Sequence, residues 1–262
     1  VTKAWVNSER TRHNLSTRIW YISITERCSV NFKYLPSQVE TVHMTGAETP
    51  FQRARSNEHR EIRKRAIVEA VRTLLKTTDP LDLAMRPLAS SVGISPSGIY
   101  RYFENIQSLL LHVHLCDFED VVLGLEDDSK LELNDLDMLA STITKTFLRE
   151  PRFLSLFSLT PALYEREVSV EGLIEHKLNL LSLMQRGAEA FMRNGHFTKT
   201  EDALQALGQM LAFALGLYPL ANPSSPSKSA LKHPELSFLN LDMRVELKAG
   251  IHTILKGWIE VG

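Results

Sequence analysis

Cysteine, glycine and proline are all scarce in this sequence of 262 residues. The two cysteines, Cys28 and Cys116, do not predict a disulfide framework and suit a reducing compartment. The 12 glycines and 11 prolines exclude a collagen-like or wholly disordered chain. No uninterrupted apolar run reaches about 18 residues, and no basic segment followed by an apolar stretch opens the sequence. We therefore expect a soluble, cytoplasmic protein that has no membrane partner.

The sequence also lacks the short motifs of common enzymes and metal sites. CxxC, HExxH, the P-loop and GxSxG are all absent. His112 and Cys116 are four residues apart and share a helical face, but His114 points away, and two ligands do not complete a zinc site. No pattern pairs two particular carboxylates for acid–base work. We expect no catalytic activity, no cofactor and no bound metal.

Charge is distributed unevenly, although the net charge is only −1. Residues 53–112 carry ten basic and six acidic side chains, whereas residues 113–262 carry 14 basic and 21 acidic side chains. The balances are +4 and −7, and residues 1–52 supply the remaining +2. A basic module followed by an acidic one indicates that only the first meets phosphates.

The most informative pattern lies in residues 84–110. A first short apolar helix ends at Gly93, which supplies the left-handed residue that often follows a helix. Ser95 is a good N-cap, and Pro96 occupies the first position of a second short helix. Two short helices joined by a tight turn predict a helix-turn-helix, whose second helix can enter the DNA major groove.

Several side chains in this pattern are candidates for DNA contact. A tyrosine hydroxyl donates well to a phosphate, and an arginine bonds either phosphate or guanine. Gly98 offers only close approach of its backbone. Two alternatives stay open: one tyrosine packs beneath the helix, or Ser95 is only a cap. The candidate DNA-binding residues are Arg86, Ser95, Pro96, Ser97, Gly98, Tyr100, Arg101 and Tyr102.

A basic amphipathic helix is predicted upstream, from Ser56 to Asp79-Pro80. Its expected apolar face comprises Ile62, Ala66, Ala70, Val71, Leu74 and Leu75. Its opposite face carries Arg60, Arg63, Lys64 and Arg65. Such a charge run is commonly just a solvated face, but next to a helix-turn-helix it favours phosphate contact.

Residues 1–52 show no persistent period of either helix or strand. We hypothesise that Val1 reflects an upstream reading-frame start and that the working protein begins near Met44. The alternative is a flexible arm that touches DNA.

Downstream, helical periodicity predicts an all-α bundle. Pro219 is expected to stop the fifth of its helices, and a Pro/Ser-rich loop is expected over 221–229. The predicted helices are Ser108–Leu125, Leu136–Leu148, Phe153–Leu159, Gly172–Asn194, Thr200–Tyr218 and Leu241–Glu260.

Small residues recur every four positions on the most apolar of these helices, at Gly208, Ala212 and Gly216. They permit close helix approach, either within the chain or between two subunits. Because a two-fold symmetric operator requires a dimer, we favour the subunit interface. The expected interface residues are Gly208, Ala212, Gly216, Ile251, Leu255 and Trp258, with Ile254 on the same face as the last three.

Over residues 58–112 the chain resembles the tetracycline-repressor-like (TetR-like) family of bacterial transcriptional regulators. The resemblance lies in REIRKRAIVEAVRTLL, SVGIS and, above all, GIYRYF followed by two leucines. It implies a homodimer of all-α subunits, each with a three-helix DNA-binding head and a helical body that binds a small effector. It also implies that Tyr100 holds a phosphate and that residues 95–102 form the reading helix.

The sequence departs from this family at three places in the head. The glycine that usually ends the first helix is replaced by Thr78-Asp79. The family usually places a phosphate-binding lysine where this chain has Ile106. It usually caps the first helix of the motif with Ser or Thr, where this chain has Ala84.

We therefore predict three regions: an irregular extension (1–52), a DNA-binding domain (53–112) and an effector-binding and dimerisation domain (113–262). The expected function is a sequence-specific regulator, most simply a repressor, that a small molecule releases from a double-stranded operator. The alternative is a helical dimeric interaction protein whose degenerate head does not read DNA specifically.

Overall fold

The structure, a computed structural model, describes residues 50–130 and 135–259. Within those ranges every regular element is helical, which confirms the predicted all-α fold. The described residues from Ala54 onward belong to one compact unit. The hypotheses about residues 1–49 lie outside the described residues. The helices are α2 (Pro50–Leu74), α3 (Met85–Val92), α4 (Pro96–Ile99), α5 (Ile106–Asp128), α6 (Leu136–Arg149), α7 (Pro151–Leu159), α8 (Val170–Arg193), α9 (Thr200–Ala221), α10 (Ser225–Ala230) and α11 (Met243–Ile259), with 3-10 turns η1 (Pro80–Asp82), η2 (Tyr164–Glu167) and η3 (Pro234–Leu239).

Helix α2 buries only part of the face that the sequence pattern favoured: Val71 is fully buried, and Ala70, Leu74 and Leu75 pack against the buried cluster. Ile67, Val68 and Val71 are buried, whereas Ile62 is 55% exposed and Ala66 is also exposed. The predicted face was wrong in part, because burying three β-branched side chains removes more apolar area from water than burying alanines.

Two short helices joined by a tight turn, α3 and α4, form where the turn chemistry predicted them. Gly93 ends α3 with a φ of +69°, and its N–H reaches the last carbonyls of the helix. Ser95 caps α4 by accepting from the N–H of Gly98 at 3.1 Å. Ala84 precedes α3 without any side-chain cap. Helix α4 is shorter than expected: it ends at Ile99, and a tight turn continues the chain.

The core of the helix-turn-helix continues directly into the body. Leu88, Ile99 and Phe103 belong to the same buried cluster as Leu156 and Tyr164, which come from α7 and η2. Helix α5 carries the cluster across the predicted boundary at residue 112 without interruption.

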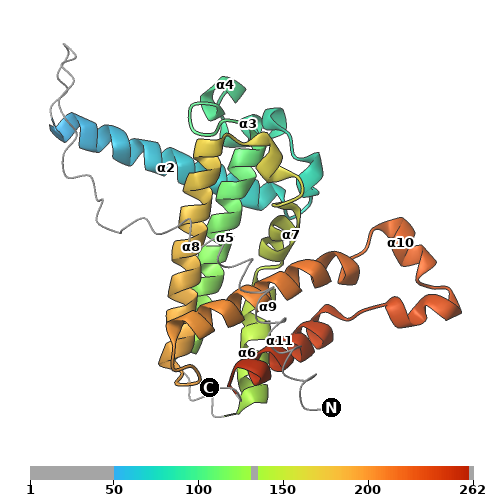
Figure 1. Cartoon of the computed structure of the whole chain (residues 1–262). Coiled ribbons are helices and arrows are strands. Elements are labelled where there is room, and N and C mark those ends of the chain that lie inside the picture. The colour runs from blue at the N-terminus through green and yellow to red at the C-terminus, as the bar shows by residue number, and fades with distance from the viewer. Residues whose placement is uncertain (1–49, 131–134, 260–262) are drawn as a thin grey trace, which may run out of the picture. The chain divides into compact units, whose positions relative to one another are not determined.

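The body is built around α5, which packs against α6, α7 and α8, while α9 packs against α7, α8 and α11 (Figure 1). Helix α9 is long and apolar enough to cross a membrane by length and composition alone. A single such helix among the described residues is weak evidence for a membrane span, because core helices of folded proteins pass the same test; 44% of this apolar stretch is buried inside the chain.

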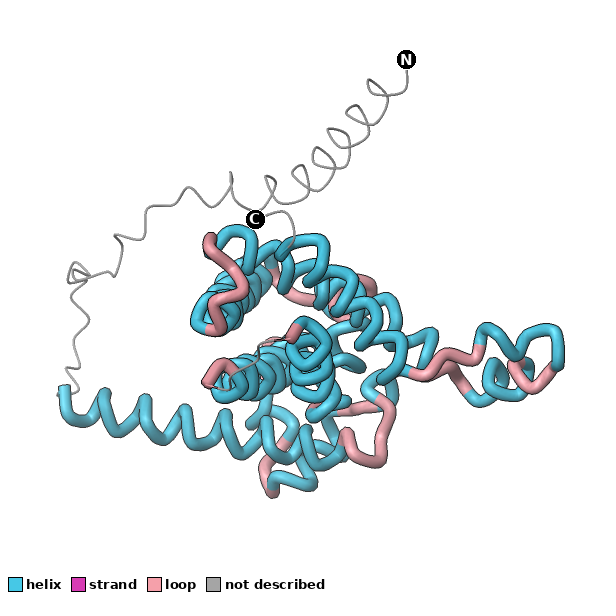
Figure 2. The backbone as a smooth tube through the Cα atoms, turned by 90° about the horizontal axis from the view of Figure 1, so that it is seen from below, coloured by secondary structure: helices cyan, strands magenta, loops and turns pink. Residues whose placement is uncertain are grey.

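Pro219 does not stop α9, contrary to our expectation. The helix runs on to Ala221, and the N–H of Asn222 bonds to the carbonyl of Tyr218 at 2.9 Å. Proline lacks the N–H that would bond to the carbonyl of Leu215, but the bond from Asn222 to Tyr218 resumes the helical pattern directly after it. The predicted loop at 221–229 instead contains α10, and α10 and η3 together project from the body as an arm (Figures 1 and 2).

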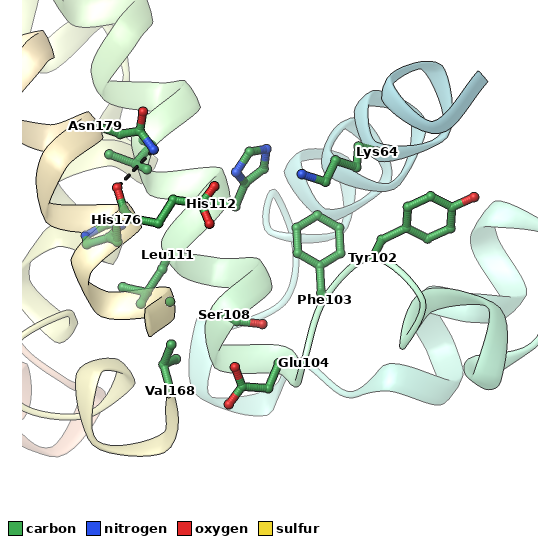
Figure 3. A pocket seen from close by; sticks show the side chains of 13 residues that line it. Lys64, Tyr102, Phe103, Glu104, Ser108, Leu111, His112, Val168, His176 and Asn179 are labelled. Carbon is green, nitrogen blue, oxygen red and sulfur yellow. Dashed lines mark hydrogen bonds between the residues drawn. The ribbon is translucent and has the colours of Figure 1, made fainter. Parts of the chain in front are cut away.

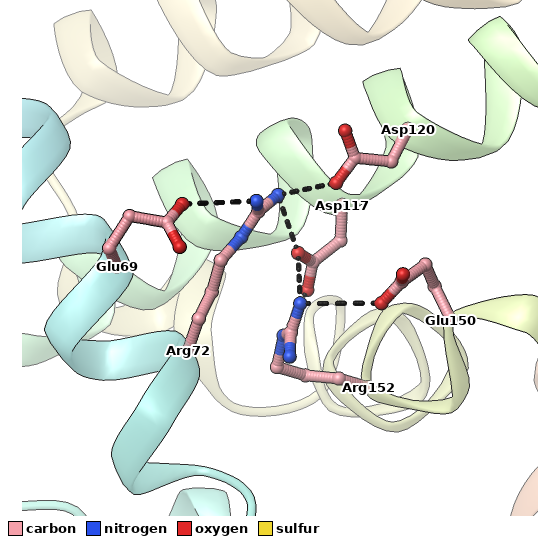
Figure 4. Close-up of polar contacts among 6 residues, drawn as sticks. All are labelled: Glu69, Arg72, Asp117, Asp120, Glu150 and Arg152. Atoms are coloured by element: carbon pink, nitrogen blue, oxygen red, sulfur yellow. Dashed lines mark hydrogen bonds and ion pairs between the residues drawn. The ribbon is translucent and has the colours of Figure 1, made fainter.

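A buried ion pair network joins α2 to the body (Figure 4). Asp117 of α5 is fully buried and accepts two hydrogen bonds from Arg152 of α7, at 2.7 and 2.8 Å. Its Oδ1 also lies 2.8 Å from Nη2 of Arg72 in α2. The same Arg72 nitrogen donates to the exposed Asp120 at 2.8 Å. Three helices are therefore held to one carboxylate.

Replacing Asp117 by Asn is expected to lower the free energy of unfolding by about 3–5 kcal/mol, because two largely buried arginines lose the charge that compensates them. Asp120→Asn is the matched control: it removes a partly exposed partner of the same Arg72, and we expect a loss below about 1 kcal/mol. Chemical denaturation measures both values. Equal losses for the two variants would contradict a special role for Asp117.

Candidate nucleic-acid interface and adjoining pocket

The residues predicted to contact DNA are mostly displayed to solvent. Ser95, Pro96, Ser97 and Arg101 are exposed, Tyr100 is 54% exposed, and Arg86 is exposed on α3. Gly98 is half-buried, and a Cβ added to it would meet the nearest atom, Ser95 Oγ, at 3.5 Å. The structure thus presents Ser95, Pro96, Ser97, Tyr100 and Arg101 at the surface, on either side of the buried Ile99.

Tyr102 differs from Tyr100 in its surroundings. It is half-buried and packs against the buried cluster of the helix-turn-helix, and it also lines a pocket. The alternative that one tyrosine packs beneath the motif therefore fits Tyr102. Tyr100 keeps its hydroxyl-bearing ring outside.

Ser95 acts as the N-cap of α4, which was one of the two roles that the sequence left open. Its Oγ caps α4 and lies 2.8 Å from the Oγ of Ser97. The hydroxyl remains exposed at the surface.

The basic residues of α2 separate into two groups. Arg60, Arg63 and Arg65 are exposed, whereas Lys64 is half-buried and lines the pocket. Ile106, at the family's lysine position, packs against the buried cluster. The Ile106 side chain has no donor that could bond to a phosphate.

The pocket has a volume of about 210 Å³ and lies where α2, the segment after α4, α5 and α8 meet (Figure 3). Lys64 comes from α2, Tyr102 and Glu104 follow α4, His112 comes from α5 and His176 from α8. No signal in the sequence revealed this site, because the five residues are spread over more than 100 positions and share no motif.

Two buried histidines extend inward from the pocket. His176 is 5% exposed and lines it, and its ring lies 5.7 Å from that of the fully buried His114. Both nitrogens of each ring are buried without a hydrogen bond to any described residue. His114 stacks on Phe153 and Phe157. Burial, and then the neighbouring His176, lower the pKa of His114 to about 3. Burial, and then Lys177, lower the pKa of His176 to about 4.

Metal binding has no support among residues 50–130 and 135–259, where no group of three His, Cys, Asp or Glu side chains is placed to hold an ion. Cys116 is a free thiol, and burial raises its pKa to about 11.

The small-residue face of α9 is open to solvent toward its C-terminal half. Ala212 and Gly216 are exposed, and a Cβ added to Gly216 would meet nothing within 4 Å. Gly208 is half-buried, with Met184 Cε at 3.6 Å from its added Cβ. The glycine at position 216 is therefore not required for packing inside the chain.

The predicted interface residues of α11 need correction. Ile251 and Leu255 are fully buried within the chain, so they cannot contribute side-chain surface to a second subunit. Their face of α11 is covered by α6 and α9. Trp258 is half-buried, and its Nε1 donates to Oε1 of Gln209 in α9 at 2.9 Å.

Comparison with known proteins places the chain in a family. Residues 117–261 match the family described as the tetracyclin repressor-like C-terminal domain. This match covers more than half of the chain, and the chain belongs to the tetracycline-repressor-like family. No curated protein matches it.

Solved structures show weaker likenesses. A TetR-family transcriptional regulator from Mesorhizobium loti has a TM-score of 0.48 at 17% identity, over 77% of this chain and 97% of that one. PfmR, a TetR-family transcriptional regulator from Thermus thermophilus, has a TM-score of 0.46 at 15% identity, over 72% and 97%. The family assignment therefore rests on the match over residues 117–261.

The two buried histidines predict a pH-dependent stability. In the unfolded chain the pKa of each histidine returns to about 6.5. Below that pH the histidines are protonated in the unfolded state but stay neutral in the folded state. Stability is therefore lost as the pH falls below about 6.5, by roughly 1–2 kcal/mol per histidine between pH 7 and pH 5. Denaturant unfolding across this range measures the loss.

Variants of the two histidines show whether they cause this pH dependence of stability. His114→Phe and His176→Phe are each expected to make it shallower, since a phenyl ring keeps the stacking but binds no proton. The exposed His233→Gln serves as the control and should leave it unchanged. The assignment fails if removal of either buried imidazole leaves the pH dependence at its original slope.

Proposed function

We propose that the chain is a cytoplasmic, non-enzymatic transcriptional regulator that binds double-stranded operator DNA as a homodimer and represses until a small effector releases it. The observation that carries this proposal is the set of exposed side chains in the stretch 95–101, namely Ser95, Ser97, Tyr100 and Arg101, held by a capped α4 whose Ile99 is fully buried. Such a stretch can reach base edges and phosphates while its helix stays fixed to the core.

The distribution of charge also favours DNA binding by the head and not by the body. Arg60, Arg63 and Arg65 are exposed on α2, and Arg86 and Arg101 are exposed on α3 and just after α4. These side chains would neutralise phosphates on either side of the reading helix, whereas the acidic body would be repelled by DNA.

The mechanism follows from two-fold symmetry. Two reading helices in a dimer engage successive major grooves when they lie about 34 Å apart. An effector that prefers another arrangement of the bodies shifts the population away from that spacing and weakens operator binding.

A competition assay on the gene's own upstream DNA tests this function. Binding that survives non-specific competitor DNA, and that weakens as salt rises, supports a sequence-specific regulator. Absent binding, or equal affinity for every sequence, would favour the alternative of a dimeric interaction protein with a degenerate head.

Three variants test the reading helix. Tyr100→Phe and Arg101→Ala are each expected to weaken operator binding by about tenfold, because each removes a donor worth roughly 1–3 kcal/mol. Gly98→Ala, which the fold accommodates at ordinary contact distances, should weaken binding if the backbone approaches DNA closely. Thermal unfolding verifies that all three remain folded. Unchanged operator affinity for Tyr100→Phe and Arg101→Ala would remove both residues from the interface.

The dimer surface has its own test. Gly216→Arg places a long charged side chain on the open face of α9, where the monomer has room for it and gains helix propensity. We expect it to shift the chain from dimer to folded monomer in analytical ultracentrifugation. Ser182→Arg, at an exposed position of α8, is the control and should remain dimeric. A dimeric Gly216→Arg would place the interface elsewhere.

A further inference from the structure

The arm formed by α10 and η3 has no hydrophobic core of its own. Neither element contains a buried residue, and within 225–239 every residue is exposed except the half-buried Leu231 and Leu236. In both views the arm extends away from the packed helices of the body, between the end of α9 and the start of α11 (Figures 1 and 2). The chain's own body therefore covers little of the arm.

A segment of this kind needs packing to hold its structure. Helix α10 has only six residues, whereas isolated helices shorter than roughly 12–15 residues are marginal in water. The arm also displays large apolar side chains: Phe238 is 76% exposed and Leu239 is 46% exposed. Burying them would offset the conformational entropy that ordering the arm costs. A surface that packs on the arm would therefore stabilise it.

The exposed apolar surface continues from the arm onto the helices at its base. Leu220 near the end of α9 and Val245 near the start of α11 are each 61% exposed. Ala212 and Gly216 are also exposed, and together with Leu220 they follow one another at intervals of four residues along one face of α9. This is the face on which the proposed homodimer packs, so a second copy that occupies it lies beside the arm.

The charge of the arm complements the charge of such a partner. Lys228 and Lys232 are exposed on the arm, where Glu235 is the one acidic residue. Residues 113–262 as a whole carry 14 basic and 21 acidic side chains. The body of a second copy is therefore an acidic surface that attracts a basic arm.

We infer that the arm packs against the body of a second copy of this chain, so that each subunit of the homodimer contacts the other through its arm. Phe238 and Leu239 supply the apolar contact, and Lys228 and Lys232 face the acidic surface of the partner. In a two-fold dimer this contact is made twice, because each copy contributes one arm and receives one. The inference rests on the homodimer of the proposed function and adds the arm to the α9 face as a second part of the interface.

The strength of the dimer tests this contact on the full chain, without DNA. Phe238→Ala is expected to raise the dimer dissociation constant at least about tenfold in analytical ultracentrifugation, because a large apolar contact is lost in both halves of the interface. Val170→Ala removes an equally exposed apolar side chain on α8 and is the matched control, which should dissociate like the unaltered chain. Circular dichroism verifies that both variants remain helical.

Cross-linking identifies what the arm touches. The photoreactive residue p-benzoylphenylalanine is placed at position 238 in one sample and at position 170 in another. Each is mixed with isotopically heavy copies of the unaltered chain and irradiated. We expect position 238, and not position 170, to give a covalent dimer in which mass spectrometry finds the light arm joined to a body peptide of the heavy copy.

The outcomes separate the arm from the homodimer itself. A dimer that Phe238→Ala leaves equally tight, or cross-links from position 238 that stay within one chain, would overturn the role of the arm and leave the homodimer standing. Dissociation caused by Gly216→Arg but not by Phe238→Ala would confine the interface to α9. An unaltered chain that is monomeric at every concentration would refute the homodimer of the proposed function, and the arm contact with it.

Discussion

The carboxylate of Asp117 is removed from water in the middle of α5, and this is possible only because two arginines reach it. Arg152 approaches from α7 with two hydrogen bonds, and Arg72 approaches from α2. An uncompensated charge at this depth would cost several kcal/mol, so α2 and α7 cannot both leave α5 without a large penalty. The network fixes α2 to the body at the same helix that continues the core of the helix-turn-helix.

The local chemistry of the helix-turn-helix was predictable because each of its signals acts within a few residues. Gly93 ends one helix and Ser95 caps the next, and both effects are properties of the backbone and the side chain at one position. The buried face of α2 was not predictable in the same way. Apolar residues surround much of that helix, and only its partners decide that Ile67 and Val68 are buried while Ile62 is exposed.

The two parts of the candidate site, the exposed residues around α4 and the pocket, also differed in how far the sequence could predict them. The exposed residues of the stretch 95–101 lie within a few positions of one another in the sequence, so their types and spacing pointed to them directly. The pocket depends on tertiary packing, which brings Lys64 of α2 and His176 of α8 to one place, and no spacing in the sequence carries that information. For the same reason, the apolar pattern of α11 could not reveal whether Ile251 faces the chain's own core or a partner subunit.

Helix α2 takes part in both features that join head and body, although through different residues. Arg72 fixes its C-terminal turns to Asp117, and Lys64, two turns earlier, lines the pocket. A rotation of α2 about this fixed end would displace Lys64 and the part of the pocket wall that Lys64 forms. Because α2 packs in the same buried cluster as α3 and α4, such a rotation would carry α4 with it. The ion pair network therefore fixes the end of α2 about which that rotation would occur.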